Sequence, residues 1–397
     1  MFKTLDDIEV NSRTVIVRGD LNVPMLNGTI SDTTRIERLV PTIRELSVKG
    51  ARVVILSHFG RPEGKVSKDM SLQGVVSALS TALDGRTVRF IDDCVGEPAK
   101  QAVAALEPGE VILLENLRFH AEEEANDREF AAELANLGDI YVNDAFSAAH
   151  RAHASTAAIT EFLPAFAGRS LQAECAALRN ALKTPTRPVM AIVGGAKIST
   201  KLAVLGNVMS RVDDLVIGGA MANTFLAAQG VQVGKSLIES TMLGEAKSIL
   251  RRAEEVGCSI HLPTDAIVAA NLEPGIVGYE VTVDEVPTDS MILDIGPQTI
   301  TTLNSVMEKC QTIVWNGPLG VFEMPPFDRG TVDVARRAGE LTQTGGLISV
   351  AGGGDTVAAL QHAGVMDQFT YVSTAGGAFL EWLEGRSLPG LLALEKN

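Results

Sequence analysis

Short runs of β-branched residues alternate along the chain with longer stretches in which apolar residues recur every three or four positions. This alternation is typical of a parallel sheet flanked by helices. In the first half, the runs predict strands over 14–18, 52–57, 111–115 and 139–143. In the second half, they predict strands over 188–193, 214–217, 291–295, 312–315, 346–350 and 370–373. We therefore expect an α/β fold from end to end.

The stretches between these runs have the spacing and the stop signals of helices. Residues 32–49 repeat apolar side chains on one face and meet Gly50, although Pro41 makes this helix less regular. Residues 122–137 show the same pattern and are closed by Gly138. A third stretch, 170–182, runs into a segment with two prolines, which disfavour continued helix. We place the seam between two halves of the chain near this third stretch.

Length and charge narrow the possibilities. A chain of 397 residues with 46% hydrophobic and 21% charged residues favours two globular domains with ample core. The formal net charge of −15 argues against nucleic acid or an anionic membrane as a partner, because both require a broad positive surface. Small anions remain possible if cationic side chains gather locally.

The cysteines and the lengths of the apolar runs indicate the cellular compartment of the protein. The four cysteines have no CxxC spacing and predict free thiols in a reducing compartment. No apolar run approaches the ~20 residues of a membrane span, and the N-terminal residues lack a signal pattern. We expect a cytoplasmic protein.

Arginines follow the predicted strands of the first half. Ligands of an open parallel sheet bind beyond the carboxyl ends of its strands. There the sequence places Arg18, Arg61 and Arg118, each beside other polar residues, and Arg151 follows the fourth strand. A single arginine is more often a surface ion-pair residue, but recurrence at one edge suits a multiply charged phospho-acid. His150 and His153 lack companion metal ligands, so we favour an anion-contacting or structural role for them.

Glycines follow the predicted strands of the second half. Strand ends are followed by Gly194-Gly195, Gly218-Gly219, Asn316-Gly317, Gly352-Gly353-Gly354 and Gly376-Gly377. Glycine lets the backbone approach a phosphate, and a following helix N-terminus offers free amides. Any one of these turns is weak support, but their recurrence predicts a nucleotide site.

Two other nucleotide motifs fit less well. The segment 230–236 resembles a P-loop, yet it has three residues between its glycines where the motif requires four. No GxGxxG sequence opens a helix after a strand with an acidic residue about 20 positions on. A dehydrogenase is therefore the second choice, and a nucleotide sensor without catalysis is a third.

Seven motifs, in order along essentially the whole chain, resemble phosphoglycerate kinases. They are Arg18-Gly19-Asp20-Leu21-Asn22-Val23-Pro24, Ser57-His58-Phe59-Gly60-Arg61-Pro62, Glu115-Asn116-Leu117-Arg118-Phe119, Asn143-Asp144-Ala145-Phe146 with His150-Arg151, Gly194-Gly195-Ala196-Lys197 with Lys201, Trp315-Asn316-Gly317-Pro318 with Phe322-Glu323, and Gly352-Gly353-Gly354-Asp355-Thr356.

The resemblance implies two Rossmann-like domains, each a mainly parallel sheet flanked by helices, joined by a hinge helix. The phosphoglycerate-binding domain would span 1–170, the interdomain helix 171–185 and the nucleotide-binding domain 186–377. The tail, 378–397, would pack back on the first domain. The implied protein is a monomer that acts on small molecules.

The resemblance also assigns the site residues. Those expected to bind 3-phosphoglycerate or 1,3-bisphosphoglycerate are Asp20, Asn22, Arg35, His58, Arg61, Arg118 and Arg151. Those expected to bind ATP or ADP are Lys197, Lys201, Gly219, Asn316, Pro318, Glu323, Gly353, Gly354, Asp355 and Thr356, with Asp355 on Mg²⁺. Those expected at the transferred phosphoryl group are Arg35, Lys197, Gly376 and Gly377.

Three positions depart from the family pattern. Thr200 stands where aspartate is common, Ala375 begins what is usually a run of three glycines, and Ile292 replaces a glycine near the adenine pocket. The charged residues of the reaction are retained. Because a carboxylate or acyl phosphate needs no general base, the expected mechanism is in-line transfer after domain closure, with charge supplied by Lys197, Arg35 and Mg²⁺.

Overall fold

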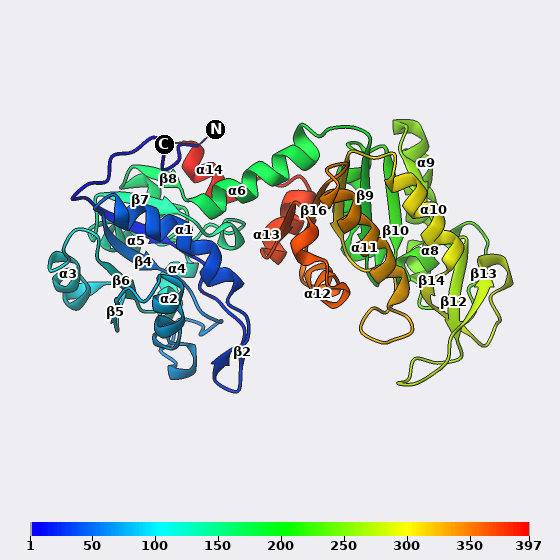
Figure 1. Cartoon of the computed structure of the whole chain (residues 1–397), viewed down its shortest axis with the longest axis horizontal. Helices are drawn as coiled ribbons and strands as arrows, with labels where there is room; N and C mark the ends of the chain where they lie inside the picture. The colour runs from blue at the N-terminus through cyan, green and yellow to red at the C-terminus, as the bar shows by residue number, and fades with distance from the viewer. Residues whose placement is uncertain (1, 397) are drawn as a thin grey trace. The chain divides into compact units, whose positions relative to one another are not determined.

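The computed structural model describes residues 2–396, which form two compact units (Figure 1). Unit 1 runs to Cys175 and includes the segment from Ser387 onward. Unit 2 is Ala176–Arg386. Within 2–396, no helix is long and apolar enough to cross a membrane.

Unit 1 is built on a six-stranded parallel sheet in the order β5-β6-β4-β1-β7-β8. Its strands are β1 Thr14–Arg18, β4 Arg52–Leu56, β5 Val88–Ile91, β6 Val111–Leu114, β7 Ile140–Asn143 and β8 Ala165–Ala167, and a two-stranded ribbon adds β2 Met25–Leu26 and β3 Thr29–Ile30. Its helices are α1 Thr34–Val48, α2 Val76–Ala82, α3 Gly96–Ala104, α4 Ala121–Glu124, α5 Arg128–Ala135 and α14 Pro389–Glu395.

The register of this sheet brings the polar strand ends together. Arg18 at the end of β1 pairs with Leu56 of β4 and with Asn143 of β7. Apart from the edge strand β5, in which Arg89 is exposed, the strands are almost entirely buried, as their Val, Ile and Leu content requires in a sheet covered on both faces. The residues that follow β1, β4 and β7 therefore start from one edge of the sheet.

Unit 2 is built on a second six-stranded parallel sheet, in the order β11-β10-β9-β15-β16-β17. The strands are β9 Val189–Gly194, β10 Asp214–Gly218, β11 Ser259–His261, β15 Thr312–Asn316, β16 Ile348–Gly352 and β17 Tyr371–Ser373. The helices are α7 Leu202–Met209, α8 Ala220–Ala228, α9 Leu243–Val256, α10 Pro297–Met307, α11 Arg329–Gln343, α12 Gly354–Ala363 and α13 Gly376–Leu383.

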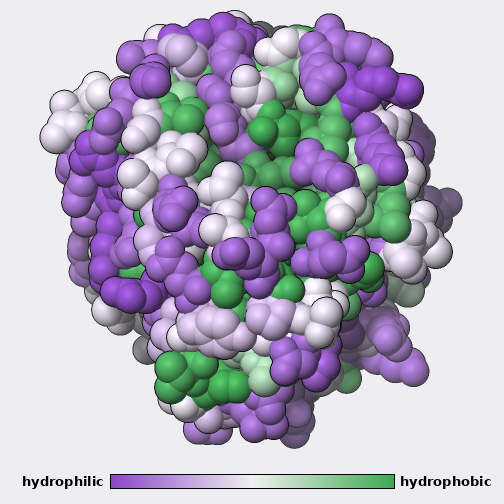
Figure 2. All heavy atoms as spheres, turned by 90° about the vertical axis from the view of Figure 1, so that its right-hand side faces the viewer, coloured by the Kyte–Doolittle hydropathy of each residue, from purple (hydrophilic) through white to green (hydrophobic). Residues whose placement is uncertain are grey.

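A three-stranded antiparallel sheet extends unit 2. It consists of β12 Asp265–Ala269, β13 Tyr279–Thr282 and β14 Met291–Ile295 in the order β13-β12-β14. The predicted strand 291–295 is present, but it pairs antiparallel with β12 and is not part of the large sheet. Figure 2 shows the face of unit 2 on the right of Figure 1, where apolar residues gather between polar ones.

Most element predictions are confirmed. Every expected strand is present, with ends displaced by at most two residues. The predicted helix 122–137 is wrong as a single element. It is broken between α4 and α5, because Asn126 takes a positive φ of 55° and Asp127 caps α5 by accepting from the amides of Glu129 and Phe130. The segment 230–236 is a loop after α8, which agrees with its rejection as a P-loop.

The boundary between the units falls inside α6, Arg169–Leu178, which continues as a π-helical segment, Arg179–Lys183. The tail differs from the expected limits. In α13, the Leu383 carbonyl accepts from Asn207 Nδ2 at 2.7 Å, so this helix packs within unit 2. Only the residues from Ser387 onward join unit 1, where the Gly390 amide donates to the Ala149 carbonyl at 2.9 Å.

Candidate active site

Unit 1 places an arginine of α1 against the loop after β1. Arg35 Nη1 lies 2.9 Å from Asp20 Oδ2 and 3.1 Å from Asp20 Oδ1. Ser147 Oγ donates to the same carboxylate at 2.5 Å, from the segment that follows β7. Asp20 thus fixes the guanidinium of Arg35 at the edge where β1 and β7 end.

The loops after β1, β4 and β6 are also connected by hydrogen bonds. Asn22 Oδ1 accepts from the Gly60 amide at 2.9 Å, and Arg118 Nη1 donates to the Gly60 carbonyl at 2.8 Å. Arg118 Nε pairs with Glu124 at 3.3 Å. Burial lowers the pKa of Arg118; Glu124 and Glu123 oppose this shift, and the nearby Arg18 and Arg151 add to it. Several cations are therefore gathered in one place, which is the arrangement that an anionic ligand would relieve.

A buried hydrogen-bond chain supports this edge from below. Glu123 Oε1 accepts from Ser155 Oγ at 2.6 Å, and Ser155 Oγ accepts from Arg18 Nε at 2.8 Å. Arg18 Nη2 lies 3.1 Å from His58 Nδ1. Glu123, Ser155 and Arg18 are all fully buried, so each of these polar groups depends on the next for its partner.

The hydrogen bond from Arg18 fixes the tautomer of His58. An arginine can only donate, so His58 Nδ1 must accept and its proton must lie on Nε2. Burial lowers the pKa of His58 well below its ordinary value, and Arg18, Arg118 and Arg35 lower it further. His58 is therefore neutral near pH 7 and offers a single N–H donor.

The remaining predicted residues of unit 1 are accessible. Arg61 and Arg151 are exposed, and Arg151 Nε lies 3.2 Å from His150 Nε2. Arg61 is three residues beyond His58 in the same loop. His153 lies 3.7 Å from Glu123 Oε1 and is buried, so it belongs to the supporting layer.

Unit 2 contains a cavity of about 340 Å³ beyond the ends of β9 and β10 and along β14. Four predicted nucleotide-site residues, Gly219, Pro318, Glu323 and Asp355, line it. Its apolar wall includes Leu237, Leu272, Pro263, Met291 and Ile292. These residues lie outside the motifs that the sequence analysis placed after the strands. Such a mixture of apolar wall and few polar groups suits a planar base.

A polar cluster next to the glycine turns joins the other predicted residues. Lys201 Nζ donates to Asn316 Oδ1 at 2.5 Å, and Asn316 Nδ2 donates to the Gly352 carbonyl at 2.7 Å. Thr356 Oγ1 accepts from the Gly317 amide at 2.7 Å. Burial lowers the pKa of Lys201, opposed by Asp355 and Glu384.

Two of the glycine turns require glycine. Gly219 has a φ of 69°, and a Cβ there would lie 2.7 Å from the Gly195 carbonyl oxygen. Gly353 has a φ of 100°, and a Cβ there would lie 2.5 Å from Asn316 Nδ2. These residues precede α8 and α12 directly, so the free amides of both helices begin at the turns.

Lys197 is exposed beside the turn that follows β9, and its carbonyl accepts from Thr200 Oγ1 at 2.9 Å. Thr200 therefore makes a local hydrogen bond to the backbone of the same turn. At the start of α13, a Cβ at Gly376 would lie 4.0 Å from the amide nitrogen of Gly354. Ile292 lines the cavity, and Ala375 is buried before α13.

Sequence reasoning missed several residues of these clusters. Glu123, Ser155 and Ser147 hold the site residues of unit 1, but no motif singled them out. Asp294 also lines the cavity of unit 2, and burial raises its pKa to about 8 while it accepts from the Gly330 amide at 2.7 Å. Such residues act through tertiary contacts, which leave no local pattern.

Comparisons with known proteins agree along the full length. Residues 5–386 match the protein-family model described as phosphoglycerate kinase. Curated relatives with that name include one from Rhizobium meliloti, 58% identical over 397 residues (100% of this chain, 99% of the relative). Another, from Allorhizobium ampelinum, is 57% identical over 396 residues, with the same coverage of both chains.

Solved structures show the same likeness. The phosphoglycerate kinase structure from Coxiella burnetii has a TM-score of 0.91 and 43% identity, covering 100% of this chain and 99% of that one. The structure of the enzyme from Pyrococcus horikoshii has a TM-score of 0.80 and 33% identity, covering 100% and 98%.

Proposed function

Because the chain belongs to the phosphoglycerate kinase family, we propose that its two side-chain clusters serve the two substrates of that enzyme. The reaction is reversible phosphoryl transfer between 1,3-bisphosphoglycerate with ADP and 3-phosphoglycerate with ATP, a step of glycolysis. The fold, two α/β units with parallel sheets, is that of the family.

The sheet edge of unit 1 that carries Arg35, Arg118 and Arg151, called the cationic edge below, is the proposed phosphoglycerate site. The residues assigned to it are Asp20, Asn22, Arg35, His58, Arg61, Arg118 and Arg151. The support is the gathering of Arg35, Arg118 and neutral His58, which offers guanidinium forks and a fixed N–H donor to carboxylate and phosphate oxygens.

The cavity and glycine turns of unit 2 are the proposed nucleotide site. Gly219, Pro318 and Glu323 would contact the nucleoside, because they line the cavity. The phosphates would lie on the turn at the start of α12. The residues assigned to them are Lys197, Lys201, Asn316, Gly353, Gly354, Asp355 and Thr356.

Asp355 is the proposed Mg²⁺ ligand. Asp355 lines the cavity from the first turn of α12, and a hard oxygen donor beside a phosphate cradle fits magnesium. Bound there, the ion would neutralise phosphate charge.

Transfer itself needs positioning and positive charge more than covalent chemistry. Arg35 from unit 1 and Lys197 from unit 2 would neutralise the equatorial oxygens, while the amides at Gly376 and Gly377 would approach the same group. Since these residues belong to different units, we propose that the units close around both substrates before transfer. We also propose that the protein acts as a cytoplasmic monomer, without nucleic-acid or membrane partners, in keeping with its net charge of −15.

The proposal depends most on one observation: Asp20 holds the guanidinium of Arg35 at the cationic edge. The test is a coupled assay in which ATP, Mg²⁺ and 3-phosphoglycerate are linked to NADH oxidation by glyceraldehyde-phosphate dehydrogenase. We expect Arg35→Ala to lower kcat by about 100-fold or more, as loss of a charge that stabilises a transition state does. ATP affinity should stay within about twofold.

Arg44→Ala is the matched control, since Arg44 lies on the same helix and pairs with the exposed Asp84. This variant should retain activity. Equal losses of turnover and ATP affinity in Arg35→Ala would remove Arg35 from the transition state. A folded wild-type protein that binds ATP but is inactive would favour a nucleotide sensor instead.

A further inference from the structure

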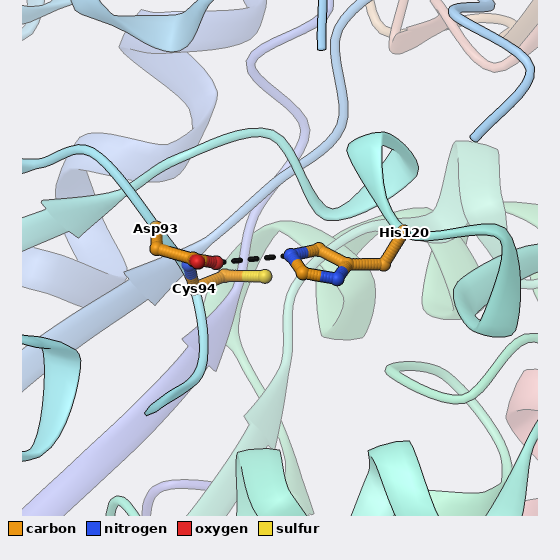
Figure 3. A group of neighbouring side chains, drawn as sticks. All are labelled: Asp93, Cys94 and His120. Atoms are coloured by element: carbon orange, nitrogen blue, oxygen red, sulfur yellow. Dashed lines mark hydrogen bonds and ion pairs between the residues drawn. The ribbon is translucent and has the colours of Figure 1, made fainter. Parts of the chain in front are cut away.

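Three potential metal ligands of unit 1 meet outside the cationic edge (Figure 3). Asp93 and Cys94 follow β5, and His120 follows η3 (Leu117–Phe119). One ligand atom from each residue lies within 4.8 Å of the others. In Figure 3, the Cys94 thiol and the Asp93 carboxylate both point toward the His120 ring.

We propose that Asp93, Cys94 and His120 bind a divalent transition-metal ion of the zinc class. A set of one thiolate, one imidazole and one carboxylate suits Zn²⁺ or Co²⁺, which accept sulfur and nitrogen ligands. Mg²⁺ and Ca²⁺ require oxygen ligands, so the thiol selects against the ion of the phosphoryl transfer reaction. Three protein ligands leave a fourth position for water.

The surrounding structure already orients the three groups. Asp93 Oδ1 accepts from the Cys94 amide at 2.7 Å and lies 2.9 Å from His120 Nε2, so its other oxygen can face a metal. The His120 ring packs against Phe130, with centroids 5.1 Å apart. Cys94 is buried, whereas the side chains of Asp93 and His120 are partly exposed and give an ion access from solvent.

Binding requires a small contraction and the loss of protons. Metal bonds of about 2.0–2.3 Å would draw the three groups inward by roughly 1 Å. The Cys94 thiol would release its proton to solvent, and His120 Nε2 would exchange a proton for the metal. Because binding releases protons from these ligands, apparent metal affinity should increase with pH.

The position of His120 links this site to the phosphoglycerate edge. His120 is the N-cap of α4, which contains Glu124, the partner of Arg118 at 3.3 Å. A metal bound at His120 would restrain the segment between these two residues. We expect the KM for 3-phosphoglycerate to change when the metal is bound, with the KM for ATP unchanged.

The test is titration of the full-length, reduced protein with Co²⁺, followed by competition with Zn²⁺. A thiolate-to-cobalt charge-transfer band in the near ultraviolet should saturate at one equivalent. Cys94→Ser should abolish the band and weaken Zn²⁺ binding by more than about tenfold, because loss of a direct ligand exceeds the effect of losing an outer partner. Asp93→Asn and His120→Gln change partly exposed residues and provide ligand variants that do not disturb the core.

Two matched controls should bind like the wild type. His362→Gln alters an exposed histidine paired with Asp328 at 2.8 Å. Cys310→Ser alters another buried thiol. The proposal is overturned if the folded wild type gives no charge-transfer band, or if the band persists unchanged in Cys94→Ser. It is also overturned if Asp93→Asn and His120→Gln both retain wild-type Zn²⁺ affinity. These readouts do not depend on the substrate roles assigned above.

Discussion

Arg18 is fully buried, and a buried guanidinium is tolerated only where its donors find acceptors. Nε, Nη1 and Nη2 reach Ser155 Oγ, the Gly19 carbonyl and His58 Nδ1 respectively. The positive charge of Arg18 is balanced by the carboxylate of Glu123, since the Ser155 hydroxyl bonds to both. At the residue scale, a supporting layer of unit 1 therefore determines which atom of His58 carries a proton.

Ser155→Ala should disturb that layer without touching a substrate. The change leaves Arg18 Nε and Glu123 Oε1 without their shared partner, which should cost about 2 kcal/mol of unfolding free energy. We expect the KM for 3-phosphoglycerate to rise about tenfold at nearly constant KM for ATP. Nitrogen-15 NMR should show loss of the single Nε2–H tautomer of His58.

The control is Ser349→Ala, which removes another buried hydroxyl, bonded to Thr342 and Thr370 in unit 2. It should lose stability without changing the KM for 3-phosphoglycerate. An unchanged His58 tautomer in Ser155→Ala would contradict a positioning role for Ser155.

His58 should also give the stability of unit 1 a pH dependence. Its folded-state pKa lies well below the ordinary value near 6.5, because burial and the surrounding arginines oppose its charge. The unfolded chain therefore binds more protons at acidic pH, and the stability present above pH 6.5 is lost as the pH falls below it. Urea unfolding at pH 7.5 and 5.5 should show a smaller loss for His58→Gln than for the wild type, and equal losses would refute this linkage.

At the scale of elements, the proposed nucleotide site of unit 2 is built mainly from the junctions between strands, glycine turns and helices. The turns before α8 and α12 contain glycines at positive φ. Gly219 lies close to the Gly195 backbone, and Gly353 lies close to the Asn316 side chain. The antiparallel β14 completes the wall of the cavity with Met291 and Ile292. The parallel sheet thus contributes the proposed phosphate side, and the smaller sheet contributes apolar surface.

Gly353→Ala and Gly364→Ala compare the two ends of α12. Both glycines have positive φ, but a Cβ at Gly353 would lie 2.5 Å from Asn316 Nδ2, whereas Gly364 has open space. Each change should cost about 1 kcal/mol of stability or more from backbone strain. Only Gly353→Ala should weaken ADP binding, by about tenfold in calorimetry. Similar ADP affinities in both variants would exclude the Gly353 turn from the nucleotide site.

At the scale of the whole molecule, each unit has its own sheet and core, and each holds one of the two clusters. The chain crosses from unit 1 to unit 2 within α6 and returns before Ser387. Helix α14, which follows unit 2 in the sequence, therefore belongs to unit 1.

Substrate-driven closure should be visible in solution scattering. If transfer requires both clusters to meet, the radius of gyration should fall when 3-phosphoglycerate and a non-hydrolysable ATP analogue are both present. Either ligand alone should produce a smaller change. A radius that stays constant with both ligands bound at saturation would contradict closure.

The sequence by itself determined ten strands, the order of the motifs and their chemistry. It did not indicate the ribbon β2–β3, the sheet strands β5, β8 and β11, or the antiparallel β12 and β13. β-branched runs and glycine or proline boundaries are local signals, so every expected strand is present. Arginines after the strands of one unit and glycines after those of the other could also be predicted to converge, because parallel strands end at one edge.

Only the tertiary structure decided which residues support those motifs. Ser155 lies 137 positions from Arg18, and Asp93 lies 27 from His120. The pairing of β14 with β12, in place of the large sheet, was likewise not encoded in its apolar run. Local periodicity specifies how a segment folds, but contacts between distant segments depend on packing and register, which arise only when the whole chain buries its core.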